Sequence, residues 1–232
     1  MKKEYAQFLL DKVNKDYSLI AKDFSRTRES VWPEIEFLFN DFLYPGNTVL
    51  DLGCGNGRWF DVFQKRSVDY IGLDNSQELI KIAQGKYPQG KFVLASALDM
   101  PFSDDFFDGI YSIAVFHQIP GSQLRLRFLE EAKRVLKPGG LLILTVWNFH
   151  RPRELILLVK YTILKLLGKS ELDFGDVFYS WGDKTKRYYH VFFKRELLSL
   201  AKASGWKVKQ IDIVKNKKGN RQNICLILQK PL

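Results

Sequence analysis

The sequence predicts an α/β protein in which helices cover both faces of a mostly parallel β-sheet. Between residues 48 and 147, short apolar segments typical of buried strands alternate with helix-like segments. A glycine-rich turn follows the first of these strands, at Gly53, Gly55 and Gly57. Alternation at this spacing is typical of parallel βαβ units. The length of 232 residues fits one such domain with additions.

Two helices are expected before the sheet begins. Residues 3–22 carry apolar side chains at roughly helical spacing, which predicts an amphipathic helix. Pro33 suits the first turn of a second helix, which we expect to extend to about Phe42. A turn at residues 45–47 then separates these helices from the sheet.

The central part of the chain predicts five parallel strands joined by helices. We expect the strands over residues 48–52, 70–74, 91–95, 107–115 and 141–147. The helices are expected over residues 58–64, 76–84 and 123–136. The segment Lys137-Pro138-Gly139-Gly140 predicts a sharp turn into the fifth strand.

The second half of the chain is less regular. Helices are expected over residues 153–167 and 194–204, whereas residues 170–186 resemble a loop. Strands over 207–214 and 223–229, joined by a basic turn, predict an antiparallel pair that closes the sheet. The sheet would then contain seven strands and be mostly parallel, with an antiparallel last strand.

Charge and cysteine content narrow the classes of function. Lys and Arg outnumber Asp and Glu by 36 to 26, and the net charge of +10 favours a polyanionic partner such as RNA or a membrane surface. A generally basic surface is the alternative. Two cysteines without a C-x-x-C pair predict no metal site and no disulfide framework. Without a signal peptide, and with its most apolar segment (155–167) too short to span a bilayer, the chain is expected to be cytoplasmic.

The glycine-rich turn is the strongest candidate for a ligand site. Glycines between a strand and a helix allow the backbone to approach a ligand closely. Asp74 ends the second strand, where a carboxylate can bind two ribose hydroxyls, and Asp99 follows the third strand. Asp51 precedes the turn, and its charge suits a cationic ligand better than a pyrophosphate. Taken alone, the turn leaves a nicotinamide-cofactor site and a plain structural turn open.

Several segments together resemble the class I S-adenosylmethionine-dependent methyltransferases. They are residues 49–57, Gly72-Leu73-Asp74, Asp99-Met100-Pro101-Phe102, Phe107-Asp108 and residues 134–140, in the family's order. The resemblance implies a Rossmann-like three-layer α/β/α sandwich and S-adenosyl-L-methionine as the cofactor. It implies that the glycines cradle the methionine part, that Asp74 holds the ribose, and that the adenine and sulfonium lie near the ends of the third and fourth strands. The implied cofactor-binding residues are Asp51, Gly53, Gly55, Asn56, Gly57, Asp74, Asn75, Leu98, Asp99, Ile113 and Ala114.

A narrower resemblance covers nearly the whole chain outside residues 150–183. Phe24-Ser25-Arg26-Thr27-Arg28, Trp32-Pro33, residues 112–117 and Arg187-Tyr188-Tyr189-His190 look like the wobble-uridine tRNA methyltransferases, which include the methyltransferase domain of the AlkB-homologue fusion proteins. These enzymes esterify the carboxylate of 5-carboxymethyluridine or a close relative. The resemblance implies a tRNA partner and, as in some eukaryotic relatives, a small activator subunit; DNA is not expected. The candidates for binding and aligning the carboxylate are Arg28, His117, Arg187, Tyr189 and His190, with Tyr188, Trp32 and Trp147 as stacking partners for the base.

The resemblance divides the single domain of residues 1–232 into four parts. N-terminal helices occupy residues 1–43, the cofactor-binding core 44–149, an insertion 150–183, and the substrate-side elements with the closing strands 184–232. We expect the insertion to form a lid or packed cap; a partner surface and an interfacial helix are the alternatives.

Other functions stay open. The family usually carries two histidines after the fourth strand, where this chain has His117 and Gln118. A small-molecule or lipid-quinone methyltransferase is the main alternative, with residues 154–167 building an apolar acceptor pocket. A non-enzymatic cofactor-binding module is a third hypothesis. The sequence Ser112-Ile113-Ala114-Val115 lacks the Asn/Asp-Pro-Pro-aromatic motif, which argues against adenine methylation.

Overall fold

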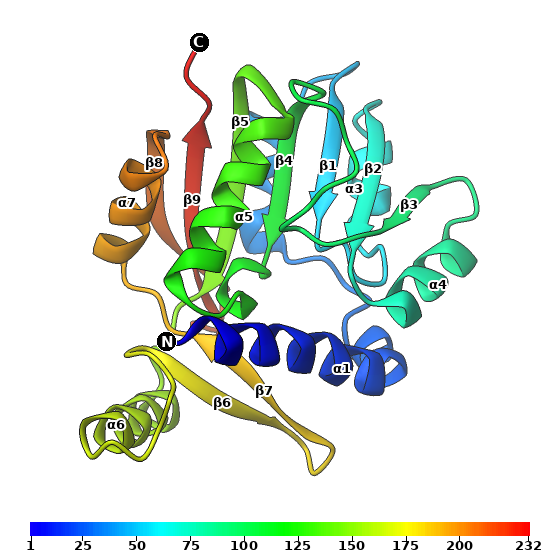
Figure 1. Ribbon diagram of the computed structural model, residues 1–232. Helices are drawn as coiled ribbons and strands as arrows, with labels where there is room; N and C mark the ends of the chain where they lie inside the picture. The colour runs from blue at the N-terminus through cyan, green and yellow to red at the C-terminus, as the bar shows by residue number, and fades with distance from the viewer.

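A seven-stranded sheet forms the centre of the molecule and is covered by helices on both faces (Figure 1). The computed structural model describes residues 1–232. The strands lie in the order β3-β2-β1-β4-β5-β9-β8, and only β9 runs antiparallel to its neighbours. The predicted three-layer α/β/α sandwich with an antiparallel last strand is confirmed. The strands of this sheet are β1 (Thr48–Leu52), β2 (Asp69–Asp74), β3 (Lys91–Leu94), β4 (Phe107–Ile113), β5 (Leu136–Trp147), β8 (Lys207–Lys215) and β9 (Gln222–Gln229).

The helices agree with the sequence pattern except near the N-terminus. The first helix ends at Thr27 rather than near residue 22, and the second predicted helix is a 3₁₀ turn followed by a short α-helix. The turn expected at residues 137–140 is the first part of β5, where the pairing with β4 shifts register between Phe107 and Gly109. The helices are α1 (Lys3–Thr27), η1 (Pro33–Ile35), α2 (Phe37–Asp41), α3 (Phe60–Gln64), α4 (Gln77–Lys86), η2 (Phe116–Gln118), α5 (Ser122–Val135), α6 (Pro152–Leu166) and α7 (Lys194–Ala203).

The loop expected at residues 170–186 is wrong, because most of that segment belongs to a β-hairpin. Strand β6 (Asp176–Trp181) pairs antiparallel with β7 (Thr185–His190) in a separate two-stranded sheet. The sequence signal was present: β6 is rich in Val, Phe, Tyr and Trp, and Gly182 supplies the positive φ of +51° that the short connection needs.

Each strand of the large sheet divides its side chains between two apolar cores. Leu50 packs on the side of α5 and α7, whereas its neighbour Val49 packs on the side of α2 and α3. This alternation follows from the two-residue period of a strand. A parallel strand buried on both faces must be apolar nearly throughout, which is the pattern that predicted the sheet.

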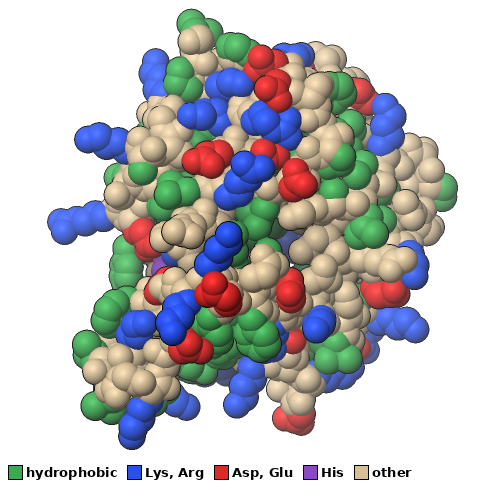
Figure 2. Space-filling model, viewed as in Figure 1, with side chains coloured by type: hydrophobic (Ala, Val, Ile, Leu, Met, Phe, Trp, Pro, Cys, Tyr) green, Lys and Arg blue, Asp and Glu red, His purple; other side chains and the backbone are tan.

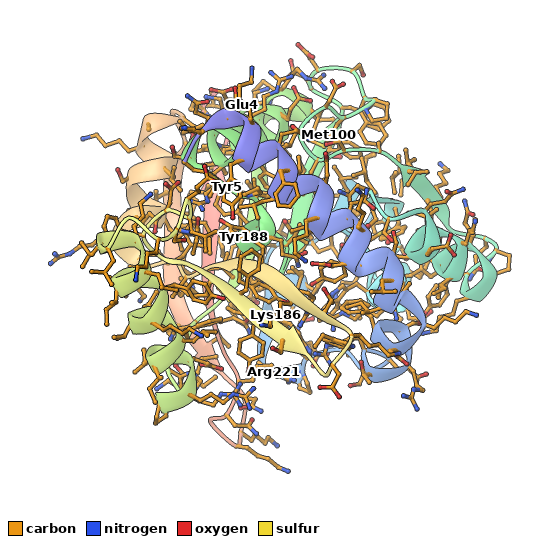
Figure 3. The ribbon with its side chains drawn as sticks, turned by 60° about the horizontal axis from the view of Figure 1, so that its bottom comes forward. Glu4, Tyr5, Met100, Lys186, Tyr188 and Arg221 are labelled. Carbon is orange, nitrogen blue, oxygen red and sulfur yellow. The ribbon has the colours of Figure 1, made fainter.

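The carboxyl ends of β1, β2 and β4 meet at one edge of the sheet, and α1 lies across that edge (Figure 1). The β6–β7 hairpin packs against α1 on its outer side, as Figure 3 shows for the strand that carries Lys186 and Tyr188. Open α/β sheets bind ligands outside the carboxyl ends of their strands. The fold therefore places a covered space where the sequence predicted the cofactor. None of the helices combines the length and hydropathy that crossing a membrane requires.

Candidate functional site

The turn after β1 is shaped by glycines in left-handed backbone conformations. Gly53 has φ +81°, and a Cβ built there would lie 2.3 Å from Cγ2 of Val115. The backbone amides of Gly53 and Cys54 donate to the carbonyl of Leu73 at 2.7 and 3.0 Å, which fixes the turn against β2. The turn therefore needs glycine at this position both for its conformation and for its close contact with the loop after β4.

Asp74 lies at the end of β2 and lines the cavity beside this turn. Its two carboxylate oxygens accept hydrogen bonds from the backbone amides of Gly55 at 2.9 Å and Ser76 at 2.8 Å. Burial raises the pKa of Asp74, and these two amides oppose that rise. Each oxygen keeps a further lone pair, so the carboxylate can also accept from a pair of ligand hydroxyls. A ribose, with two neighbouring hydroxyl donors, fits this pair of acceptor oxygens.

The other predicted cofactor residues fall into two groups. Gly53, Gly55, Asn56, Asp74, Asn75, Leu98, Ile113 and Ala114 line one cavity, as predicted positions for a shared ligand should. Asp51, Gly57 and Asp99 do not line it. Asp99 is exposed, and its backbone amide donates to the carbonyl of Ser96 at 3.2 Å, which makes it part of the turn that presents Leu98.

Asp51 lies beneath the turn and is almost fully buried. Its carboxyl group accepts a hydrogen bond from the Tyr70 hydroxyl at 3.0 Å. Burial raises the pKa of Asp51 to about 7, although the Tyr70 hydrogen bond and the nearby Arg58 pull in the other direction. A positive ligand above the turn would favour the ionised form.

Ala114 is strained in a way that suits a binding loop. It follows β4 with φ +61°, a conformation that residues other than glycine rarely adopt. The backbone amide of Ala114 donates to both the carbonyl oxygen and Oγ1 of Thr145, each at 3.0 Å. Those bonds hold the strained residue at the cavity wall.

Asn56 connects the turn to the end of α1. Its side-chain amide is buried and donates to Oγ of Ser25 at 3.1 Å and to the carbonyl of Arg28 at 3.4 Å. The backbone before Arg28 is thereby held against the cofactor turn. Asn56 thus links the predicted cofactor residues to the predicted acceptor residues.

Three arginines without carboxylate partners line the acceptor side of the cavity, whose empty space of about 1070 Å³ is partly open to solvent. Arg28, Arg58 and Arg187 appear in no ion pair, and the Nη1 of Arg58 and Nε of Arg187 are buried without hydrogen-bond partners. Burial and the neighbouring Arg28 lower the pKa of Arg58 to about 10. Buried donors of this kind are costly unless a ligand satisfies them. The arrangement therefore suits an anion.

Aromatic rings hold these guanidinium groups in place. Arg187 lies 4.4 Å from the ring centroid of Trp181, and its Nη1 donates to the Tyr17 hydroxyl at 3.0 Å. Arg58 lies 4.5 Å from the ring centroid of Trp32. Cation–π contacts stabilise a charge without neutralising it. The three arginines thus keep their charge available to a ligand.

His117 and Tyr189 lie directly behind the cavity wall. The His117 ring lies 5.2 Å from the rings of both Trp147 and Tyr189, measured between centroids. Burial, and then the positive charge of Arg187, lower the pKa of His117 to about 3, so the ring is neutral. Its Nε2 is buried without a partner. Neither residue lines the cavity itself; both support Trp147, which does.

His190 and Tyr188 lie outside the cavity, in a buried ionic network. The ring nitrogens of His190 lie 2.6 Å from Asp176 Oδ1 and 2.8 Å from Glu196 Oε1. The Tyr188 hydroxyl donates to Asp176 at 2.7 Å, and Arg125 joins both residues. Adjacent residues of a strand point to opposite faces, so Arg187 and Tyr189 face the cavity side while Tyr188 and His190 face away. The expected grouping of all four at the substrate does not occur.

Sequence reasoning missed Arg58, Trp59 and Trp181. The first two line the cavity. The ring of Trp181 lies against the guanidinium groups of Arg187 and Arg28, with Arg28 5.3 Å from the ring centroid. An arginine directly after the third glycine of the turn was an available signal for Arg58. Trp181 is not predicted, because the sequence predicts a loop for the hairpin that carries it.

Comparison with known proteins shows the family to which this chain belongs. A family model described as a methyltransferase domain matches residues 50–144. A protein of Encephalitozoon cuniculi that carries the name of a methyltransferase is 34% identical over 196 residues, which cover 84% of this chain and 87% of that protein.

Two further comparisons extend the likeness. The tRNA (carboxymethyluridine(34)-5-O)-methyltransferase of Arabidopsis thaliana is 39% identical over 66% of this chain, but the match spans only 36% of that protein. A solved structure of an S-adenosylmethionine-dependent methyltransferase from Methanosarcina mazei superposes with a TM-score of 0.74 at 22% identity, covering 88% of this chain and 99% of that one. With the glycine turn, the Asp74 acceptors and these relatives taken together, the chain belongs to the class I S-adenosylmethionine-dependent methyltransferases.

Proposed function

We propose that this methyltransferase esterifies the carboxylate of a modified wobble uridine of the 5-carboxymethyluridine type in tRNA. The observation that carries the proposal is the group of three arginines, Arg28, Arg58 and Arg187, which lines the acceptor side of the cavity without a carboxylate partner. A carboxylate is the anion whose geometry a guanidinium group matches best, together with phosphate.

The proposed chemistry needs no general base. A carboxylate with a pKa near 4 is ionised at neutral pH and is itself the nucleophile. One carboxylate oxygen forms a bond to the methyl carbon, the carbon–sulfur bond breaks, and its electron pair stays on sulfur. The bound cofactor supplies the electrophilic methyl group. The protein's part is to align the two groups and exclude water, which the arginines and the ring of Trp147 support.

The neutral state of His117 agrees with this chemistry. An imidazole with a pKa near 3 carries no positive charge near the cofactor's sulfonium and cannot protonate the carboxylate at neutral pH. We assign His117 and Tyr189 to positioning Trp147, and His190 to holding β7 against α7. Arg28, Arg58 and Arg187 are the residues proposed to contact the carboxylate.

Relatives support a tRNA substrate. The Arabidopsis protein is named for carboxymethyluridine in tRNA, as is a mouse relative that is 36% identical over 60% of this chain. This chain spans about a third of the first and a fifth of the second. Basic side chains spread over the visible face, interspersed with acidic ones (Figure 2), and the net charge of +10 favours association with a polyanion.

The small-molecule alternative loses its main support. It required residues 154–167 to build the acceptor pocket, but none of the apolar side chains in that segment lines the main cavity. Leu155, Ile156, Val159 and Ile163 are instead exposed on the outer face of α6. The insertion therefore contributes Trp181 to the site through the β6–β7 hairpin. Its helix, α6, does not line the main cavity.

The test is methyl transfer from radiolabelled S-adenosylmethionine. Purified protein is incubated with bulk tRNA from a strain that lacks this gene and, separately, with a small-metabolite extract. Label that enters tRNA and is released by mild base indicates an ester and supports the proposal. Base-stable label in tRNA, or label only in the metabolite extract, overturns it. If the purified chain is inactive and host extract restores transfer to tRNA, an activator subunit is required.

A further inference from the structure

We propose that a second cavity beside the first binds the phosphodiester and base of the nucleotide next to the methylated one. This cavity has about 800 Å³ of empty space, partly open to solvent, and lies between the end of α1, the start of the insertion and the turn before β9. The inference rests on the proposed function, because it extends an RNA substrate beyond its reacting base.

The two cavities are adjacent and share part of their walls. Arg28, Trp32 and Trp147 line both of them. The ring of Trp32 lies between two guanidinium groups, with Arg58 at 4.5 Å on the side of the first cavity and Arg221 at 4.9 Å on the side of the second. A single extended ligand can therefore occupy both spaces.

The second cavity has a surplus of positive charge. Arg28, Arg151 and Arg221 line it, and two carboxylates pair with them: Glu154 in the wall with Arg151, and Glu34 with Arg221. Glu154 is already engaged, since it accepts hydrogen bonds from Nε of Arg151 at 2.8 Å and from the backbone amides of His150 and Arg151 at 3.1 Å each. Arg221 uses Nε and Nη2 to bind Glu34 and leaves Nη1 without a partner. The guanidinium group of Arg28 donates only to the carbonyl of Thr27, at 3.1 Å.

Aromatic surface accompanies this charge. Trp147 and Phe149 line the cavity and are only partly buried, so their rings can be reached. Proteins recognise unpaired nucleotides by stacking bases on aromatic rings and guanidinium planes, and by binding the connecting phosphates with cationic groups. A free carboxylic acid of small size needs neither feature outside the first cavity.

The wall of the second cavity is firmly built. Asn148 and Gln222 are joined twice, by a backbone hydrogen bond of 3.0 Å and by their side-chain amides, also at 3.0 Å. The His150 ring lies between the carbonyls of Asn148 and Gly219, at 3.0 and 3.1 Å. These contacts fix the start of the insertion to the turn between β8 and β9. A ligand would meet a surface that is already ordered.

The experiment compares two acceptors, the nucleoside 5-carboxymethyluridine and a trinucleotide with that nucleoside in the middle. The readout is the ratio of their kcat/KM values, which we call the trinucleotide advantage. Because Arg221→Gln would leave Glu34 buried without a partner, the variant used is Glu34→Gln/Arg221→Gln. We expect the advantage to fall about tenfold, as for loss of one charge-assisted hydrogen bond. The salt dependence of trinucleotide affinity should weaken by about 0.7 in log–log slope.

Controls separate this inference from the proposed function. Arg195→Gln removes one charge from an exposed position on α7 that lines neither cavity and should keep the full advantage. An unchanged advantage in the double variant overturns the inference, as does an equal loss in the Arg195 variant. If the wild-type protein methylates neither these acceptors nor tRNA, with or without host extract, the proposed function fails. The second cavity is then tested by calorimetric titration with uridine trinucleotide, and equal affinity in wild type and double variant overturns it.

Discussion

Replacing Arg187 with methionine should strongly reduce catalysis while leaving the stability of the fold nearly unchanged. The Arg187 side chain is almost fully buried and has no carboxylate partner. Its Nη1 donates to Tyr17 at 3.0 Å, its Nε has no partner, and its charge faces the ring of Trp181. Methionine has a similar length and no charge, so Arg187→Met removes the guanidinium group with little change in packing.

The expected loss in catalysis is much larger than any expected loss in stability. If Arg187 binds the substrate carboxylate through two charge-assisted hydrogen bonds, their loss costs about 3 kcal/mol, or about 150-fold in kcat/KM. The fold loses the bond to Tyr17 and the cation–π contact with Trp181, about 1 kcal/mol each, and these losses are offset because a buried charge without an ion-pair partner is removed. We therefore expect the free energy of unfolding to stay within about 1 kcal/mol of wild type or to rise.

Steady-state methylation of the carboxymethyluridine trinucleotide and urea unfolding measure the two quantities on the same preparation. Arg187→Lys is the matched control: it keeps the charge but loses the planar fork, so about a tenfold loss of kcat/KM is expected. The reasoning is refuted if Arg187→Met lowers the unfolding free energy by about 3 kcal/mol or more while kcat/KM stays within about threefold of wild type. That outcome would make Arg187 a structural residue.

Three further substitutions test the cofactor half of the site. Because burial raises the pKa of Asp51 to about 7 in the folded protein, against about 4 unfolded, its proton stabilises the fold at low pH and that stability is lost as pH rises from about 4 to 7. Urea unfolding should show wild type losing about 2.5 kcal/mol more than Asp51→Asn between about pH 5 and pH 8, and parallel curves would contradict this. Asp74→Asn should weaken S-adenosylmethionine binding by about 2–3 kcal/mol in calorimetry, since the ribose and two backbone amides all need a carboxylate oxygen; an unchanged Kd would remove Asp74 from the site. Gly53→Ala places a Cβ 2.3 Å from Val115 at φ +81° and should cost about 2–4 kcal/mol of unfolding free energy. Adding Val115→Ala should recover the steric part and leave about 1–2 kcal/mol, and no recovery would argue against the contact.

Periodicity explains both what the sequence predicted and what it missed. Strand–helix alternation and the glycine turn placed Gly53, Asp74 and Ala114 at one edge of the sheet, because parallel strands must end together. The same two-residue period would have separated Arg187 from His190, since residues three apart on a strand face opposite sides. The resemblance to a motif grouped them instead.

Other parts of the site depend on contacts that no local pattern contains. Arg58 reaches the acceptor side only because Trp32, far away in the chain, lies against its guanidinium group. Trp181 comes from a hairpin in the insertion at residues 150–183, which the sequence resemblance does not cover. Both roles depend on tertiary contacts, and the local sequence around Arg58 and Trp181 does not indicate them.

The surplus positive charge of the main cavity also affects the release of the methylated product. Arg28, Arg58 and Arg187 have no internal counter-ion, so under the proposed function an incoming carboxylate supplies the balance. Methylation converts that anion into a neutral ester and the sulfonium into a neutral thioether. The guanidinium groups are then again uncompensated, and the electrostatic attraction that recruited the acceptor no longer holds it. Under the proposed function, methylation would therefore by itself weaken the retention of the modified base in the main cavity.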